Sequence, residues 1–240
     1  MIYDQAEFAV RCEWGLHGVR LLAPISAAVI IVDVFSFSTA VEIATWRGAA
    51  IYPYAAQSDA ASAYADSVGA ELAASYGMSS GYSLRPHSLV SIPKGMRLVL
   101  PSRNGSRLSL ETGSTPTLTA CLRNYSAVAA AAQRFGDQIA VIPAGERWSD
   151  GSLRPALEDW LGAGAVISCL RGPLSPEAAA ARAACDAVAA DAAALLAACS
   201  SSKELLSRGF AEDVALAFEL DISDCVPLLI DGAYRCITQA

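Results

Sequence analysis

Histidine and paired cysteines are the residues that this chain of 240 amino acids lacks most clearly. Only His17 and His87 occur, and the seven cysteines are scattered, odd in number and without a C-x-x-C pair. We therefore interpret the cysteines as small buried hydrophobic residues rather than as metal ligands or a redox pair. The scarcity of histidine argues against a zinc site and against a serine hydrolase. No G-x-G-x-x-G motif follows a predicted strand, which argues against a dinucleotide-binding oxidoreductase.

Charge and hydropathy argue against a nucleic-acid-binding protein and against a membrane-spanning one. The 17 basic residues form no cluster and are outnumbered by 24 acidic ones, so the net charge is −7 and a nucleic-acid partner is not expected. No uncharged apolar run reaches the roughly 18 residues that a membrane span needs. Residues 1–7 are acidic, whereas a secretory signal begins with basic residues. We therefore expect a cytoplasmic protein without a membrane partner.

Three parts of the chain share one plan, in which an apolar strand leads into a polar corner and then into a helix. The strands are predicted at residues 27–32, 97–100 and 139–142, and the corners at residue 33, at 101–106 and at 143–147. The helices are predicted at residues 38–44, at 107–110 and from about Pro155 to a stop at 162–164. Continuous apolar strands of this kind are buried on both faces. The pattern therefore predicts an α/β fold, a three-layer α/β/α architecture with a mostly parallel or mixed sheet.

The domain organisation follows from the length and from a weak internal likeness. A single domain over residues 1–240 should bury roughly 70% of its unfolded surface, and the hydrophobic fraction of 54% suits this. Gly48 and Gly164 each end a predicted helix before a short apolar stretch, at residues 49–52 and 165–167, that we predict to be a strand. The two strand–helix–strand stretches suggest an internal duplication, with halves at about 1–110 and 111–240.

Four other segments have recognisable patterns. Ser175 and Pro176 are typical of a helix start, and an alanine-rich helix is predicted to run from there to residue 199. A short helix is predicted at residues 203–208. A β-hairpin is predicted over residues 226–237, turned by Asp231-Gly232. Residues 77–93 are predicted to form a long loop, which in compact domains is often functional.

The polar corners are the candidate site, because ligands of open α/β sheets bind beyond the carboxyl ends of the strands. Asp33 is the strongest single candidate. Its carboxylate could bind Mg²⁺ or attack phosphorus directly, or it could merely cap the following helix. The backbone N–H groups of Asn104-Gly105-Ser106 could hold a phosphate, although Asn-Gly is also a common turn pair.

Charged residues near the corners allow two interpretations each. Arg103 and Arg147 could clamp an anionic substrate or could be surface charges. Glu158 and Asp159 could bind metal or transfer protons, but the helix dipole favours acids in the first turn of a helix in any case.

The ordered set of corners resembles the motifs of the 2-phosphosulfolactate phosphatase family, over about residues 27–237. Residues 33–39 (Asp-Val-Phe-Ser-Phe-Ser-Thr) are similar to the family's Asp-Val-Leu-Arg-Ala-Ser-Thr. Residues 102–106 (Ser-Arg-Asn-Gly-Ser) are similar to its Thr-Thr-Asn-Gly-Thr. The Ala-Gly, Glu-Asp and Ala-Gly pairs at 144–145, 158–159 and 163–164 and the stretch from Glu212 to Pro227 also resemble the family pattern.

The resemblance implies Mg²⁺-dependent hydrolysis of the phosphomonoester of a small acid, such as 2-phosphosulfolactate. Asp33 and Glu158 would be catalytic, and Asp33 and Asp159 would bind Mg²⁺. The substrate would be bound by Ser38, Thr39, Ser102, Arg103, Asn104, Gly105, Ser106, Gly145, Glu146 and Arg147. Homo-oligomer formation is left open.

Two positions depart from the family pattern. Ser36 stands where the family has arginine, and Ser83 stands where the loop resembling Gly-Phe-Asp-Leu-Gly-Asn-Ser-Pro has its acid. These departures leave open an alternative, a non-catalytic member that binds a small anion or a protein partner. Arg85, which the family pattern lacks, could instead restore the missing positive charge from the neighbouring loop.

Overall fold

A computed structural model describes residues 2–75 and 81–237. Its centre is a nine-stranded sheet, and a separate two-stranded sheet joins β8 (Glu146–Arg147) to β9 (Leu153–Arg154). The strands of the large sheet, in spatial order, are β1 (Val10–Cys12), β7 (Ile139–Pro143), β2 (Ala28–Val32), β6 (Thr117–Ala120), β10 (Pro227–Ile230), β11 (Ala233–Cys236), β3 (Ala50–Tyr54), β5 (Arg97–Pro101) and β4 (Glu71–Leu72).

The sheet consists of two parallel blocks separated by a hairpin. Strands β1, β7, β2 and β6 are parallel to one another, as are β3, β5 and β4. The hairpin β10–β11 lies between the blocks and is antiparallel to β6 on one side and to β3 on the other. Three antiparallel pairings therefore separate the blocks, so their strands run in opposite senses along the sheet.

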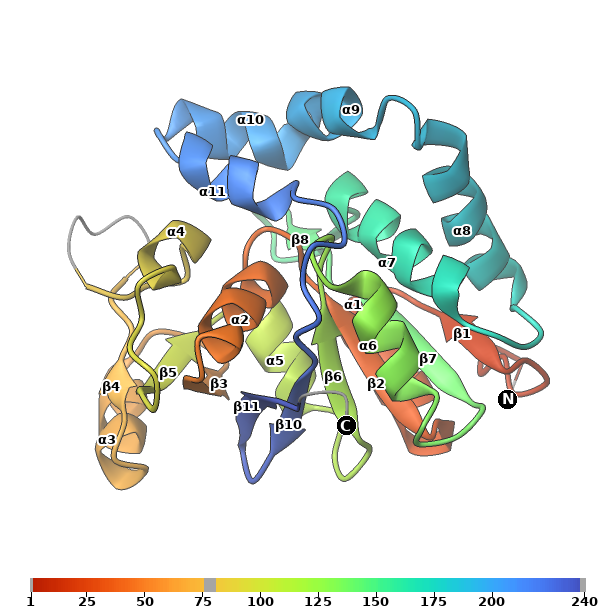
Figure 1. Ribbon diagram of the computed structural model, residues 1–240. Coiled ribbons are helices and arrows are strands. Elements are labelled where there is room, and N and C mark those ends of the chain that lie inside the picture. Colours follow the sequence, from red (N-terminus) through yellow and green to blue (C-terminus); the bar gives the residue numbers. More distant parts are fainter. Residues whose placement is uncertain (1, 76–80, 238–240) are drawn as a thin grey trace.

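Helices cover both faces of the sheet, which confirms the predicted three-layer α/β/α architecture (Figure 1). Their bounds are α1 (Gly15–Leu22), α2 (Phe37–Trp46), α3 (Asp59–Ser67), α4 (Pro86–Leu89), α5 (Gly105–Leu110), α6 (Tyr125–Ala132), α7 (Leu157–Cys169), α8 (Pro176–Val188), α9 (Ala192–Ala198), α10 (Ser200–Ser207) and α11 (Ala211–Ala217), with a 3₁₀ turn at Ala23–Ile25. Helices α8 to α11 form an arc over one end of the molecule. None of the helices in the described ranges is long and apolar enough to cross a bilayer.

Strand β2 shows why the apolar runs form buried strands. All five of its residues are buried, and alternate side chains point to opposite faces. Val29 and Ile31 pack with α1 and with Leu108 of α5, whereas Ile30 and Val32 pack in the cluster that includes α6, α7 and α8. Both faces of β2 are therefore buried by packed side chains. The polar corner that follows is attached to a well-packed strand.

The hairpin and the short helix near the C-terminus are confirmed. The hairpin turns at Asp231 and Gly232, both with positive φ, and α10 ends before Gly209. The predicted loop over residues 77–93 contains the short helix α4, and residues 77–80 lie outside the described residues.

Two predictions about the C-terminal half are wrong. Residues 162–167 form neither a helix stop nor a strand, because α7 continues to Cys169, so the second strand–helix–strand stretch behind the suggested duplication lacks its final strand. The long helix predicted up to residue 199 is divided into α8 and α9.

Close helix packing explains the glycines in α7. A Cβ atom on Gly164 would lie 2.3 Å from the Ala181 carbonyl oxygen and 2.7 Å from the Cys185 Cβ, both on α8. The glycine therefore permits the contact between α7 and α8 and does not terminate the helix.

Gly164→Ala tests this explanation through the sign of the change in the free energy of unfolding. In an unhindered helix interior the exchange should raise the free energy of unfolding by about 1 kcal/mol. Here the contact with a backbone atom should outweigh that gain, and we expect a loss of about 1–3 kcal/mol in chemical denaturation. An equally stable or more stable variant would show that α8 does not pack closely on this residue.

Candidate active site

Asp33 follows β2 directly and fixes the position of two helices. Its Oδ1 accepts the Phe37 N–H of α2 at 3.3 Å, and its Oδ2 accepts the Gly105 N–H of α5 at 2.7 Å. The Ser38 hydroxyl accepts the Asp33 N–H at 2.9 Å, and the Ser38 N–H donates to the Asp33 carbonyl at 2.8 Å. The carboxylate therefore caps the N-terminus of α2, which was one of the interpretations of Asp33, and also binds the N-terminus of α5.

The contact with α5 requires glycine at position 105. A Cβ atom there would lie 2.2 Å from the Phe37 ring and 2.8 Å from Asp33 Oδ2. Glycine at this position thus permits a close approach between two segments more than 70 residues apart in sequence.

Asp159 fastens the third corner in the same way. Its Oδ1 accepts the Val34 N–H and its Oδ2 accepts the Gly145 N–H, both at 2.8 Å. Asp159 is 3% exposed. It therefore ties α7 to the chain after β2 and to the chain after β7.

Glu146 completes the connection, since its Oε2 accepts the Asn104 Nδ2–H at 3.0 Å. The corners represented by Asp33, Asn104 and Glu146 thus meet around one cleft, as predicted. The prediction that all three follow strands ending at one edge of the sheet is wrong for Asn104. Strands β2 and β7 are parallel neighbours and share an edge, but β5 belongs to the other block and runs in the opposite sense.

The twist of the sheet between the two blocks offers a reason for this convergence. The hairpin that separates the blocks is aligned with each of them at one residue pair, Leu228–Leu118 and Tyr234–Ile51. Neighbouring strands twist by about 20–25°, so the five steps from β2 to β5 add up to roughly 100–125°. This twist turns the end of β5 towards β2, and the Gly105 N–H completes the contact.

A cavity of about 540 Å³ lies where the corners meet. One side is lined by Asp33, Phe35, Ser36, Pro101, Ser102, Arg103, Asn104 and Glu146. The rest is lined by Ala56, Gln57, Ala74, Ser75, Leu84, Ser201, Glu204, Leu205 and Arg208. The volume is in the range that accommodates a small-molecule ligand.

The carboxyl groups at the cavity repel one another. Burial raises the pKa of Asp33 to about 7, and the charge of Glu146 adds to the rise. Burial, then the charge of Asp33, holds the pKa of Asp159 well above its usual range. Burial also raises the pKa of Glu146, although the hydrogen bond from Asn104 opposes this. A cation would relieve this repulsion.

Several predicted substrate-binding groups serve the fold instead. The hydroxyls of Ser38 and Thr39 bond to Thr119 Oγ1 (2.6 Å) and to the Val34 carbonyl (2.8 Å), and the Ser106 hydroxyl donates to the Leu100 carbonyl at 2.8 Å. The Gly105 N–H is taken by Asp33. The Gly105 N–H is thus not available to a phosphate, and the phosphate-binding role of Asn104 and Ser106 stays a prediction. Ser102, Arg103 and Asn104 line the cavity.

The remaining predicted residues lie around or behind the cavity. Arg147 donates to the carbonyls of Gly151 (3.1 Å) and Arg103 (3.4 Å), so it holds its own turn and the loop after β5. Glu158 is 1% exposed and accepts the Cys199 thiol at 3.5 Å. Gly145 contributes its N–H to Asp159.

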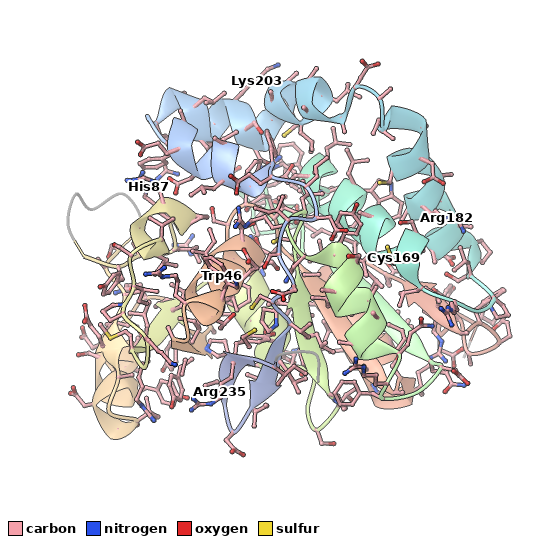
Figure 2. The ribbon with its side chains drawn as sticks, in the orientation of Figure 1. Trp46, His87, Cys169, Arg182, Lys203 and Arg235 are labelled. Atoms are coloured by element: carbon pink, nitrogen blue, oxygen red, sulfur yellow. The ribbon has the colours of Figure 1, made fainter. Side chains whose placement is uncertain are left out.

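The departures from the family pattern have distinct structural roles. Ser36 lines the cavity, whereas the Ser83 hydroxyl accepts the Arg85 N–H at 3.3 Å and helps to shape the turn before α4. Arg85 donates to Asp213 at 2.7 Å. His87, which is labelled in Figure 2, lies 3.3 Å from Glu212, the residue before Asp213. The suggestion that Arg85 restores a charge to the site is therefore wrong, because Arg85 is not among the residues that line the cavity and the buried Asp213 of α11 holds its guanidinium.

Sequence reasoning missed the contribution of α10. Ser201, Glu204, Leu205 and Arg208 line the cavity at helical spacings of three and four residues, which is one face of a helix. That spacing is visible in the sequence, but nothing local indicates that this face points to the corners. Within residues 2–75 and 81–237, no group of three His, Cys, Asp or Glu side chains is already arranged to hold a metal.

Asp159→Ala should destabilise the protein. It leaves the Val34 and Gly145 N–H groups without their acceptor, and each unsatisfied buried group costs about 1–3 kcal/mol, so we expect a loss of about 2–5 kcal/mol in the free energy of unfolding. Asp186→Ala, at an exposed position on α8, is the matched control and should change stability by less than about 0.5 kcal/mol. Equal stability of the two variants would show that Asp159 does not hold the segments after β2 and β7 in place.

The pKa of Asp33 predicts how stability depends on pH. Because the folded pKa is raised to about 7, the folded state holds a proton that the unfolded state has already lost above about pH 4. The contribution of Asp33 to the free energy of unfolding should therefore fall as pH rises from about 4 through 7.

Denaturation at pH 5 and pH 8 measures this effect. Asp33→Asn should show a smaller drop between the two pH values than the wild type. The variant should also be less stable at both, because an amide offers one acceptor oxygen to two N–H donors. A drop of equal size in both proteins would refute the raised pKa.

Comparison with known proteins agrees with the geometry. The sequence model of the 2-phosphosulpholactate phosphatase family matches residues 20–232. A 2-phosphosulfolactate phosphatase of Methanothermobacter thermautotrophicus is 33% identical over 147 residues, which are 61% of this chain and 62% of that protein. The alignment thus spans less than two thirds of the relative. Because the family match extends over most of the chain, the protein belongs to the 2-phosphosulfolactate phosphatase family.

Proposed function

We propose that this protein is a Mg²⁺-dependent phosphatase that hydrolyses the phosphomonoester of a small, strongly acidic molecule, with 2-phosphosulfolactate as the first candidate. The observation that carries the proposal is the single cavity at which Asp33, Asn104 and Glu146 meet, in a chain that belongs to this family. Catalysis of this kind depends on placing charge and hydrogen-bond donors around a phosphoryl group.

The donor chemistry at the cavity suits Mg²⁺. Asp33 and Glu146 present hard carboxylate oxygens to the same space. Burial raises the pKa of each, and the charge of Glu146 adds to the rise at Asp33. Mg²⁺ is commonly held by one or two carboxylates together with water and substrate phosphate, so a complete protein cage is not required. When bound, it would neutralise charge on the phosphoryl group.

This assignment differs from the sequence-based one at two residues. Asp33 and Glu146 line the cavity, whereas Asp159 is not among its lining residues and holds two backbone N–H groups behind it. We therefore assign Asp159 a positioning role and give the metal to Asp33 and Glu146. Glu158 is buried against Cys199, and we give it no contact with the substrate.

The other groups around the cavity would orient the substrate. The hydroxyls of Ser36 and Ser102 and the side-chain amide of Asn104 are uncharged hydrogen-bonding groups beside the two carboxylates. Arg103 adds a positive charge next to Asn104. These groups would hold the phosphate oxygens while the carboxylates stay ionised towards the cation.

Glu146→Gln is the sharpest test, because it removes the charge and keeps an oxygen that can accept the Asn104 N–H. We expect hydrolysis of 2-phosphosulfolactate to fall by about 100-fold or more, with no loss in the free energy of unfolding. Wild-type activity should disappear in EDTA and return with added Mg²⁺.

Glu177→Gln, at an exposed position on α8, is the matched control and should keep full activity. A folded wild-type protein that hydrolyses no phosphomonoester in the presence of Mg²⁺ would refute the proposed activity. Activity that is indifferent to EDTA would refute the metal assignment alone.

A further inference from the structure

The cavity has a second charged side that the corner motifs do not provide. Helix α10 presents Ser201, Glu204, Leu205 and Arg208 to it. Lys203 lies on the opposite face of the same helix, and Figure 2 places it at the outer rim of the arc of helices. One face of α10 is therefore a wall of the site, and the other faces solvent.

Two separate segments supply the positive charge at the cavity, the loop after β5 and the end of α10. Of the described residues that line it, Arg103 and Arg208 are the basic ones, whereas Asp33, Glu146 and Glu204 are acidic. Arg103 follows Ser102 and precedes Asn104, so it belongs to the side where the phosphate would bind. Arg208 directly follows α10, an element separate from that corner, and lines the same cavity.

Arg208 is held in place by its neighbours. Its guanidinium lies 5.2 Å from the ring centroid of Phe210, and its Nη1 is 3.7 Å from Glu204 Oε1. The Arg85 guanidinium lies 4.3 Å from the same ring and is anchored by the buried Asp213. Phe210 is thereby fixed, which limits the positions that the Arg208 guanidinium can take beside the cavity.

We propose that Arg208 is the residue that recognises the second anionic group of the substrate, a carboxylate or a sulfonate. This inference rests on the proposed function and adds the determinant of substrate choice. A phosphomonoester that carries such a group needs a cation at its far end, and a guanidinium binds planar and tetrahedral oxyanions through two parallel N–H groups.

Substrate selectivity tests the proposal. The two substrates are 2-phosphosulfolactate, which carries additional anionic groups, and p-nitrophenyl phosphate, which carries none. Arg208→Gln should lower the ratio of kcat/KM for the first to that for the second by about tenfold, mainly through a higher KM. Arg208→Lys should recover part of the ratio, since it keeps the charge and loses the paired N–H groups.

Lys203→Gln is the matched control, because it removes one positive charge from the outer face of the same helix and should leave the ratio unchanged. An equal loss on both substrates, or an unchanged ratio in Arg208→Gln, would overturn the proposal.

Binding separates the failure of this proposal from that of the proposed function. If the wild type hydrolyses neither substrate, the Kd for 2-phosphosulfolactate is measured by calorimetry with the Mg²⁺-loaded protein. A Kd about tenfold weaker in Arg208→Gln than in Lys203→Gln would support the role of Arg208 in binding alone. Equal Kd values, or no binding by the wild type, would overturn it.

Discussion

The site depends on two buried carboxylates that accept hydrogen bonds from backbone N–H groups. Asp33 accepts from the first turns of α2 and α5, and Asp159 accepts from the segments that follow β2 and β7. Strand pairing connects the segments after β2 and β7, but it does not connect either of them to the segment after β5, which belongs to a block of opposite strand direction. The hydrogen bond from Asn104 to Glu146 joins the segment after β5 directly to the segment after β7. The polar network therefore assembles a site that sheet pairing alone would leave divided.

The same network carries an electrostatic cost. Buried acids near one another have raised pKa values, and their ionisation destabilises the folded state while no cation is present. A site of this kind gains stability when it binds a cation, since binding to the folded state alone shifts the unfolding equilibrium. Fold and proposed function are thus connected through the charge of Asp33, which caps helices and also faces the cavity. Asp159 caps neither helix; it holds the segments after β2 and β7 together and is not among the residues that line the cavity.

Local patterns in the sequence predict much of this arrangement. The apolar runs predict β2, β5 and β7 to within a residue or two, and the polar residues after them lie at the site. Which of those residues face the ligand could not be predicted, because Ser38, Thr39 and Ser106 are chemically suited to a phosphate but bond to the protein itself. The hairpin between the blocks, the packing role of Gly164 and the approach of α10 all depend on contacts between distant segments. Residue spacing carries no information on such contacts.

Amide hydrogen exchange tests the central claim most directly. The N–H groups of Val34, Phe37, Gly105 and Gly145 lie in corners or at helix starts, where exchange is normally fast. The Ser152 N–H is a suitable reference, because it bonds to a carboxylate that is exposed, that of Asp150, at 2.9 Å. If the buried carboxylates hold the site together, the four amides should exchange at least about 100-fold more slowly than the Ser152 amide. Exchange of all four at the rate of Ser152 would contradict the account.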